Sequence, residues 1–397
     1  MPDSFSVSYI RDNMRGAPVI NGNTPGCLIA ALDALLVSGW GAAAPTTVTV
    51  ASGVATATFA SATAWQVHAV IEVSGGTPSA INGKARVATS AGNTLTWATS
   101  AADGTYTGSI SIKYASAGWE KVFSEGTTKA VYRSTDVTGS RRYYRVDDSG
   151  NTSARVRGFA EMTDVDTGTE PFPTDAQISG GGYILKTTSV SSVPVLYLLA
   201  ADSKSVLISI AAGTFGNAWQ ANTRGFGDPR PLAPAGDIYS AFLSAGGGST
   251  PSNLDVGALD GSASNSSSAG FTVALRSRSG SVGAVWQRPM PATGLLGALS
   301  GACDYLGAAP SAIDGQIKHC QMLLRDQAAN EPVRAVVPGV RYIPQSGARA
   351  VFETAFALFD GADEFAGRKL AIVYVDETTP SHTAPGVSLI DITGPWR

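Results

Sequence analysis

The acidic stretch "EMTDVDTGTEPFPTDAQ", residues 161–177, contains the residue types in this chain best suited to metal chemistry. An EF-hand calcium loop needs oxygen ligands at positions 1, 3, 5, 7, 9 and 12 and a glycine at position 6. Counted from Asp164, position 3 is Asp166 and position 12 is Asp175, but the glycine falls at position 5. Prolines occupy positions 8 and 10, and no amphipathic helix flanks the stretch. The spacing is therefore wrong for a calcium loop.

The same stretch has the composition of a turn. Asp and Thr side chains in such a turn hydrogen-bond to nearby backbone amides. We therefore predict an acidic turn, no metal site and no cofactor. One alternative stays open, in which oxygens of Asp164, Asp166 and Glu170 converge on a cation at about 2.4 Å.

Nucleophilic catalysis requires a base next to the nucleophile, and the chain has only three histidines, His68, His319 and His382. His319 precedes Cys320 in "IKHCQMLL", which has the pattern of a buried strand or helix. Adjacent strand residues point to opposite faces, so these two are not expected to pair. His68 lies in an apolar strand pattern and His382 in a polar loop pattern. Sequence motifs of serine hydrolases, zinc proteases, P-loops and C-x-x-C sites are absent from the sequence.

A glycosidase needs two carboxylates that flank the bond it cleaves. No pair stands out among the candidates, which are Glu120, Asp147, Asp148, Glu161, Glu353, Asp360 and Asp391. Asp147 and Asp148 precede Ser149-Gly150, an ordinary turn composition. The seven tryptophans could stack on sugars, but aromatic residues in such a chain more often fill β cores. We propose no catalytic residue and expect a protein that is not an enzyme.

These residues must be positioned by mainly β structure. The first element is a short helix in "TPGCLIAALDALLVSGWG", with Thr24 as N-cap, Pro25 at the first helical position and Gly39 at its end. Short β-branched runs separated by Gly, Asn and Asp then predict a small all-β module over residues 46–114, inserted between the helix and the rest. Residues 1–45 are expected to belong to the main core.

Residues 115–397 form one larger β-rich unit by pattern, with two subdomains as an alternative. The strongest hairpin signal is "VLYLLAADSKSVLISI", in which two apolar runs flank the turn residues 202–205. The polar, low-complexity stretch 246–270 is predicted to be a flexible surface loop. The predicted fold is an antiparallel, β-sandwich-like core with a short N-terminal helix and the inserted module.

The composition limits the classes of partner. Charged residues make up 15% of the 397 residues, against about a quarter in typical domains, and the net charge is −3. No basic run extends beyond Arg141, Arg142 and Arg145, so binding to nucleic acid or to an anionic membrane is not expected. Three cysteines are too few for a disulfide framework and indicate assembly in a reducing compartment. The N-terminal segment has no apolar signal core, and no stretch reaches the roughly 20 apolar residues that span a bilayer.

Several segments resemble one known family when they are taken together. They are "LIAALDALLVSGWG", "GWEKVFSEGTTKAVYRS", "RRYYRVDDSG", "ARVRGFAEMTDVDTGTEPFPT" and "GRKLAIVYVDETTPSHTAPGVSLIDITGPWR". The chain resembles a family of uncharacterised virion structural proteins of tailed bacteriophages and prophages. The resemblance covers most of the chain, is patchy between residues 200 and 300, and carries no catalytic residues. The module 46–114 is similar to add-on domains of phage tail and surface proteins.

The resemblance implies a building block of the virion, in the tail, baseplate or head–tail region, which is assembled in the cytoplasm of the bacterial host. Its partners would be copies of itself and other virion proteins, since virion subunits assemble by symmetric contacts. Two alternatives stay open. One is a capsid-surface or decoration protein, and the other is a receptor- or glycan-binding virion protein that uses exposed tryptophans and the loop 246–270.

Overall fold

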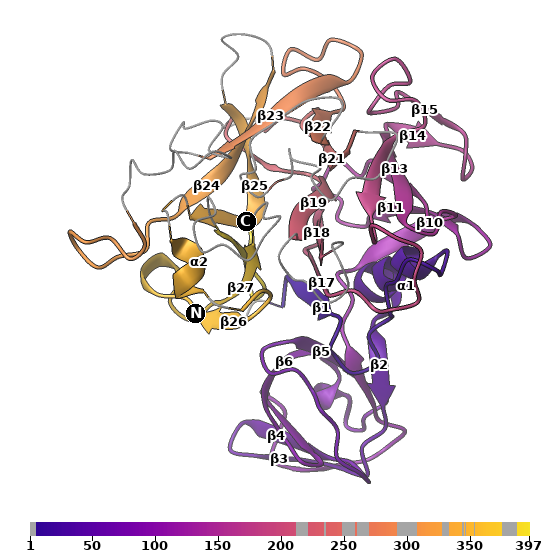
Figure 1. Ribbon diagram of the computed structural model, residues 1–397. Coiled ribbons are helices and arrows are strands. Elements are labelled where there is room, and N and C mark those ends of the chain that lie inside the picture. The colour runs from indigo at the N-terminus through magenta and orange to yellow at the C-terminus, as the bar shows by residue number, and fades with distance from the viewer. Residues whose placement is uncertain are drawn as a thin grey trace.

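The protein consists of a large β-rich domain and a small β domain that projects from it (Figure 1). The prediction of a mainly β, antiparallel fold with a short helix near the N-terminus is confirmed. The computed structural model describes residues 5–211, 221–233, 236–247, 259, 270–291, 308–327, 333–343, 345, 347–352, 354–374 and 387–397. Most of the predicted loop 246–270 lies outside the described residues.

The N-terminal helix α1 (Cys27–Asp33) continues as a π-helical turn over Ala34–Ser38 and ends at Gly39, whose φ of 70° suits glycine. Its apolar face is buried in the large domain. The predicted cap is wrong, because the residue before the helix is Gly26 and no side chain of the preceding segment caps it. The carboxylate of Asp148 accepts the amide protons of Leu28 and Ile29 instead, at 2.8 and 3.4 Å.

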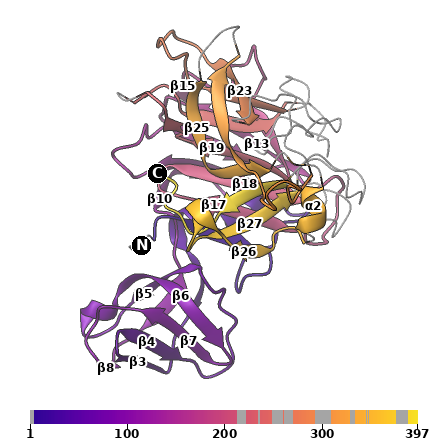
Figure 2. The same cartoon turned by 90° about the vertical axis from the view of Figure 1, so that its left-hand side faces the viewer.

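The small domain is an eight-stranded antiparallel sheet with the order β2-β9-β5-β6-β7-β4-β3-β8. Its strands are β2 (Trp40–Ala43), β3 (Thr47–Ala51), β4 (Val54–Thr58), β5 (Val70–Ser74), β6 (Gly83–Ala91), β7 (Thr94–Ala98), β8 (Gly104–Tyr106) and β9 (Ser111–Tyr114). An isolated bridge between Thr77 and Thr107 joins the segments after β5 and β8, so the sheet folds back on itself. Figure 2 shows β5 and β6 toward the large domain and β3, β4 and β8 away from it.

The sheet of the small domain begins earlier than residue 46, the predicted start of the module. Trp40 of β2 is paired with Tyr114 of β9, and their rings stack with centroids 4.9 Å apart. The ring of Trp65 also packs against Tyr114, with ring centroids 5.0 Å apart. The aromatic pairing across the two ends of the inserted segment therefore closes the domain where it leaves the large one.

The first half of the large domain is a meander. It consists of β10 (Trp119–Glu125), β11 (Lys129–Ser134), β12 (Tyr143–Asp147), β13 (Ser153–Phe159) and β16 (Gly182–Leu185), each antiparallel to the next. A separate two-stranded hairpin, β14 (Glu161–Met162) and β15 (Gly168–Thr169), follows β13. The segments "GWEKVF…AVYRS" and "RRYYRVDD" pair with each other as β10–β11–β12.

The predicted hairpin over residues 195–210 is also present, as β17 (Tyr197–Ala201) and β18 (Ser205–Ala211). All residues of both strands are buried, and Asp202 accepts the amide protons of Lys204 and Ser205 in the turn. β1 (Ser8–Arg11) pairs with β17, and β18 pairs with β19 (Ala221–Gly227). This hairpin is the centre of the large domain.

Antiparallel pairings continue from β19 to the C-terminal strands, of which β24, β25, β26 and β27 lie to the left of β10–β19 in Figure 1. The strands are β21 (Phe242–Gly246), β22 (Gly270–Ala274), β23 (Val285–Pro291), β24 (Cys320–Asp326), β25 (Val333–Ile343), β26 (Leu358–Asp360), β27 (Lys369–Tyr374) and β28 (Val387–Asp391). The two-residue strand β20 (Arg230–Pro231) pairs with β25, and β25 also pairs with β24 and β28. A short helix, α2 (Ala348–Val351), precedes β26. No helix in the described ranges combines the length and the apolar character needed to cross a membrane.

Contacts between side chains and backbone fix the small domain to the large one. The Arg86 guanidinium on β6 donates to the carbonyl of Thr393 at 3.1 Å, and Lys84 donates to the carbonyl of Ser116 at 2.8 Å. Lys113 on β9 donates to the carbonyl of Ser38 at 2.8 Å. The largest cluster of buried apolar residues is continuous across both domains. The small domain is thus held by packing as well as by its two chain connections.

Candidate functional site

The acidic stretch lies at the hairpin β14–β15 and forms a turn stabilised by its own side chains. Asp164 Oδ1 accepts the amide protons of Asp166 and Thr167 at 2.8 and 2.7 Å. These hydrogen bonds hold the pKa of the exposed Asp164 carboxyl below its usual range. They are the interactions that the turn interpretation predicts.

The three carboxylates considered as cation ligands face different partners. Asp166 forms ion pairs with Lys129 at 2.9 Å and with Arg145 at 2.5 Å, and both cations lower its pKa. Glu170 forms a two-point ion pair with Arg276, at 2.7 and 2.5 Å, which lowers the pKa of Glu170. Within the described part of the chain, no group of three or more acidic, histidine or cysteine side chains is arranged to hold a metal ion. The structure therefore does not bring Asp164, Asp166 and Glu170 together.

The printed contacts of His319 and Cys320 are with different partners. His319 lies 3.5 Å from a carboxylate oxygen of Glu364, with its ring edge-on to Phe365, whereas the Cys320 thiol donates to the carbonyl of Tyr342. Burial is the main cause that lowers the pKa of His68 in the small domain. Cys303 and His382 lie outside the described residues. The described histidines and cysteines show no arrangement of nucleophile and base.

The tryptophans mostly fill the cores. Five of them are less than 8% exposed: Trp40, Trp65, Trp97, Trp119 and Trp396. Trp286 is partly buried and packs edge-on against Phe271 with ring centroids 5.5 Å apart. Trp219 lies outside the described residues. None of these six described tryptophans offers a fully exposed ring for stacking on a sugar.

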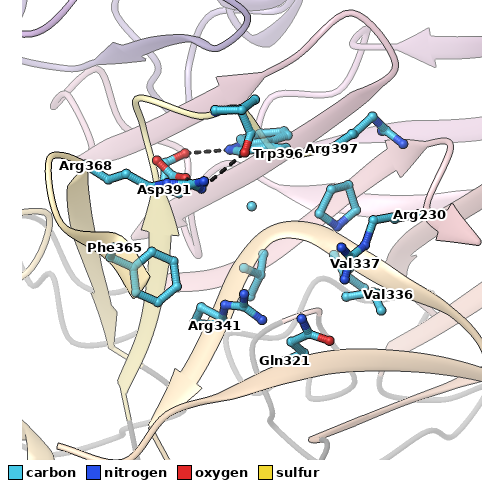
Figure 3. Close-up of a pocket in the computed structure, with 14 residues that line it drawn as sticks. Arg230, Gln321, Val336, Val337, Arg341, Phe365, Arg368, Asp391, Trp396 and Arg397 are labelled. Atoms are coloured by element: carbon cyan, nitrogen blue, oxygen red, sulfur yellow. Dashed lines mark hydrogen bonds and ion pairs between the residues drawn. The ribbon is translucent and has the colours of Figure 1, made fainter. Parts of the chain in front are cut away.

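A pocket lies where β25 meets the last residues of the chain (Figure 3). It has a volume of about 200 Å³ and is open to solvent on one side. Residues 336–341 of β25 form its floor, and Arg230 of β20 and Gln321 of β24 reach it from neighbouring strands. The rest of the wall comes from Phe365 and Arg368, which precede β27, and from residues 391 and 395–397.

Residues 391–397 form a tight, self-bonded turn beside this pocket. Asp391 Oδ1 accepts the amide protons of Thr393 and Gly394, both at 2.9 Å, and the Trp396 indole donates to the Asp391 carbonyl at 2.7 Å. The indole lies on Gly339, where an added Cβ would be 2.4 Å from a ring atom. Gly339 also has a φ of 76°, so both space and backbone conformation require glycine there. The string "DITGPWR" is thus a folded structural unit that forms one wall of the pocket.

Four arginines and one aspartate are the charged residues that line the pocket. Arg368 donates to Asp391 Oδ2 at 2.7 Å and to the carbonyl of Pro395 at 3.1 Å. Arg397 donates to Asp202 Oδ2 at 2.8 Å and to Ser205 Oγ at 2.6 Å. These two arginines are therefore neutralised by carboxylates and fixed in position.

The other two arginines, Arg230 and Arg341, have weaker partners. With its amide oriented to satisfy both, Gln321 accepts from Arg341 at 2.9 Å and from Arg230 at 3.3 Å. The carboxylate closest to Arg341 is the exposed Glu364, at 3.9 Å. Burial lowers the pKa of Arg341, Glu364 opposes this shift, and the positive charges of Arg230 and Arg368 add to it. The described lining of the pocket consequently carries an excess of positive charge, and it includes no histidine, cysteine or serine that could act as base or nucleophile.

No protein-family model and no curated protein matches this chain. The pocket was not predicted from the sequence, because its arginines are spread from residue 230 to residue 397 and belong to four separate segments. The one sequence signal near it was the distinctive ending "DITGPWR".

Proposed function

We propose that the protein is a non-enzymatic structural subunit of a tailed-bacteriophage virion. Its place is the tail, baseplate or head–tail region, and it assembles there as a symmetric oligomer with copies of itself and with other virion proteins. The observation that carries this proposal is that residues in the segments with the family resemblance hold separate parts of the fold together.

The first such residue is Trp119, in "GWEKVF". Trp119 is buried, and its indole donates to the carbonyl of Asp202 in the central β17–β18 turn at 2.9 Å. Its ring packs against Tyr144 and Phe226 at 6.2 and 5.9 Å. This residue therefore fixes the first meander strand to the centre of the large domain.

The second such residue is Asp148, in "RVDDSG". It forms an ion pair with Lys186 at 2.5 Å, and both side chains are fully buried. Asp148 also binds the start of α1, as described above, and Lys186 donates to the carbonyl of Gly150 at 2.8 Å. A buried pair of this kind contributes more to a unique arrangement than to net stability. The segments with the family resemblance thus contain residues that hold the fold together. This is what proteins that share a structural role are expected to have in common, whereas enzymes would share catalytic residues.

Exposed apolar side chains provide a surface for contacts between subunits. Val137, Ile238 and Leu232 are 81%, 64% and 49% exposed. They lie in or next to segments that line a second cavity, of about 300 Å³, near Arg397. Exposed apolar groups gathered in one region are typical of protein–protein contact sites. This region supports assembly with neighbouring chains.

The projecting small domain supports a second candidate, a capsid-surface or decoration protein. Figures 1 and 2 show that this domain extends from one end of the large domain, with most of its strands away from it. Such a domain suits a lattice whose large domains pack side by side. For a glycan-binding role, the burial of the described tryptophans leaves no observation in its favour among the residues that the structure describes.

Electron microscopy of particles labelled with an antibody against residues 46–114 tests the proposal. We expect label on purified particles at the tail, the baseplate or the neck. Label spread over the capsid would favour the decoration protein. As a control, the antibody must bind the isolated protein. If the particles then remain unlabelled and denatured particles show no band for the protein, both proposals are contradicted.

A further inference from the structure

Among the described side chains around the arginine-lined pocket, the carboxylates pair with two of its four arginines and leave two positive charges without a close carboxylate. Arg368 is paired with Asp391, and Arg397 is paired with Asp202. Among the described residues, no carboxylate lies within hydrogen-bond distance of Arg230 or Arg341, since Glu364 is 3.9 Å from Arg341. A neutral amide, Gln321, is their shared acceptor. Two like charges held around one small cavity are unfavourable unless an anion enters it.

The pocket also holds its cations in a defined geometry. The guanidinium groups of Arg341 and Arg368 both lie over the ring of Phe365, at 5.2 and 5.9 Å from its centroid. Arg368 is further fixed by Asp391, and its buried Nε has no hydrogen-bond partner among the described residues. Buried donors are normally satisfied, so a donor without a partner beside a cavity points to a ligand that completes it. In Figure 3, Arg341, Arg368 and Arg230 surround the cavity from different sides.

We propose that this pocket binds a compact, doubly charged oxyanion group, a phosphate or a sulfate. Two uncompensated arginines match the charge of a dianion, and guanidinium groups bind tetrahedral oxyanions through paired, charge-assisted hydrogen bonds. A volume of about 200 Å³ accommodates one such group and not a run of nucleic-acid backbone. The group is either a free ion or the ester end of a larger molecule, because the pocket is open on one side.

Isothermal titration calorimetry of the full chain with inorganic phosphate tests the proposal, at constant ionic strength set with chloride. We expect saturable binding with one site per chain, and binding of sulfate to the same site in competition. Glycerol phosphate distinguishes the sources: binding at least as tight as that of inorganic phosphate indicates an ester, and weaker binding indicates the free ion. Acetate, with a single charge, is expected to bind at least tenfold more weakly than phosphate.

Three variants at two positions and one control make the test specific. Arg230 is exposed, so Arg230→Gln should fold normally, and we expect it to weaken phosphate binding roughly tenfold, which is about 1.4 kcal/mol. Arg341→Gln should have at least the same effect, and Arg341→Lys should restore part of the affinity. The control is Arg278→Gln, an exposed arginine outside the pocket, which should leave binding unchanged.

Three results would overturn the proposal. They are the absence of saturable binding of phosphate and sulfate, equal affinity in Arg230→Gln and the unmodified chain, and acetate binding as tight as phosphate binding. Sulfate and phosphate also stabilise proteins that have no specific site for them. A rise in the thermal unfolding midpoint on adding either anion is therefore evidence for the site only when it is lost in Arg230→Gln and kept in Arg278→Gln.

Discussion

Replacing Lys186 by methionine would leave the buried carboxylate of Asp148 without its cation. Lys186 and Asp148 are both 0% exposed and lie 2.5 Å apart. Removing one partner of a buried ion pair typically costs about 3–5 kcal/mol, because an uncompensated charge stays in the core. Lys186→Met should therefore lower the free energy of unfolding by this amount. Lys121→Met is the control, since its pair with Asp33 is about 30% exposed and such pairs contribute about 0–1 kcal/mol.

The double variant separates the charge effect from packing. In Lys186→Met with Asp148→Asn, the remaining amide is neutral and its oxygen can still accept from the start of α1. We expect the double variant to be more stable than Lys186→Met alone. Urea unfolding followed by circular dichroism gives the free energies, and hydrogen–deuterium exchange of residues 27–38 reports the helix directly. Exchange in this segment should be faster in Lys186→Met than in Lys121→Met.

The pH dependence of the stability lost in Lys186→Met gives a further check on the charge of Asp148. Burial raises the pKa of Asp148 above its ordinary value of 3.8, and Lys186 opposes this shift, so its loss raises the pKa further. A carboxyl with a raised folded-state pKa contributes stability that is fully present below the unfolded-state pKa and is lost as pH rises through the folded-state pKa. The defect of Lys186→Met should therefore shrink as pH falls toward 3.8. A cost below about 1 kcal/mol at neutral pH, or a cost that does not change with pH, would refute the role assigned to this pair.

Three other predictions concern the cores. Tyr9→Phe should raise the free energy of unfolding by about 1 kcal/mol in urea denaturation, because the buried Tyr9 hydroxyl has no hydrogen-bond partner among the described residues; a loss of stability would contradict this. Burial raises the pKa of Tyr114 to about 12 from 10.0, so stability should fall as pH rises between these values, and a constant urea midpoint there would be the contrary result. A fragment of residues 40–116 should have a higher thermal midpoint than one of residues 46–114, since it keeps Trp40, whose loss costs about 3–5 kcal/mol; equal midpoints would show that β2 adds nothing.

Local sequence patterns were sufficient for the strands and most turns. The β17–β18 hairpin follows from two apolar runs around residues 202–205, and all of its strand residues are buried as such runs require. The hydrogen bonds of Asp164 likewise follow from short-range turn chemistry. These features depend on interactions between residues that are close in the sequence.

Features that depend on distant partners were not predictable in the same way. Asp148 has the sequence context of an ordinary exposed turn residue, yet it is buried because Lys186 and the start of α1 meet it from 38 and 120 residues away. The early start of the small domain at Trp40 depends on its pairing with Tyr114. The arginine pocket depends on the pairing of β20 with β25 and on the turn at residues 391–397. None of these contacts leaves a periodic or spaced signal in the sequence.

Quantitative mass spectrometry of purified phage particles tests the structural role most directly. Under the proposed function a phage encodes the chain, so particles of that phage are purified, and the copy number of the protein is measured against a subunit of known stoichiometry. We expect the protein in every preparation, at a fixed copy number that corresponds to a closed ring of the tail, baseplate or neck. Its absence from mature particles, or a copy number that varies between preparations, would contradict a structural subunit.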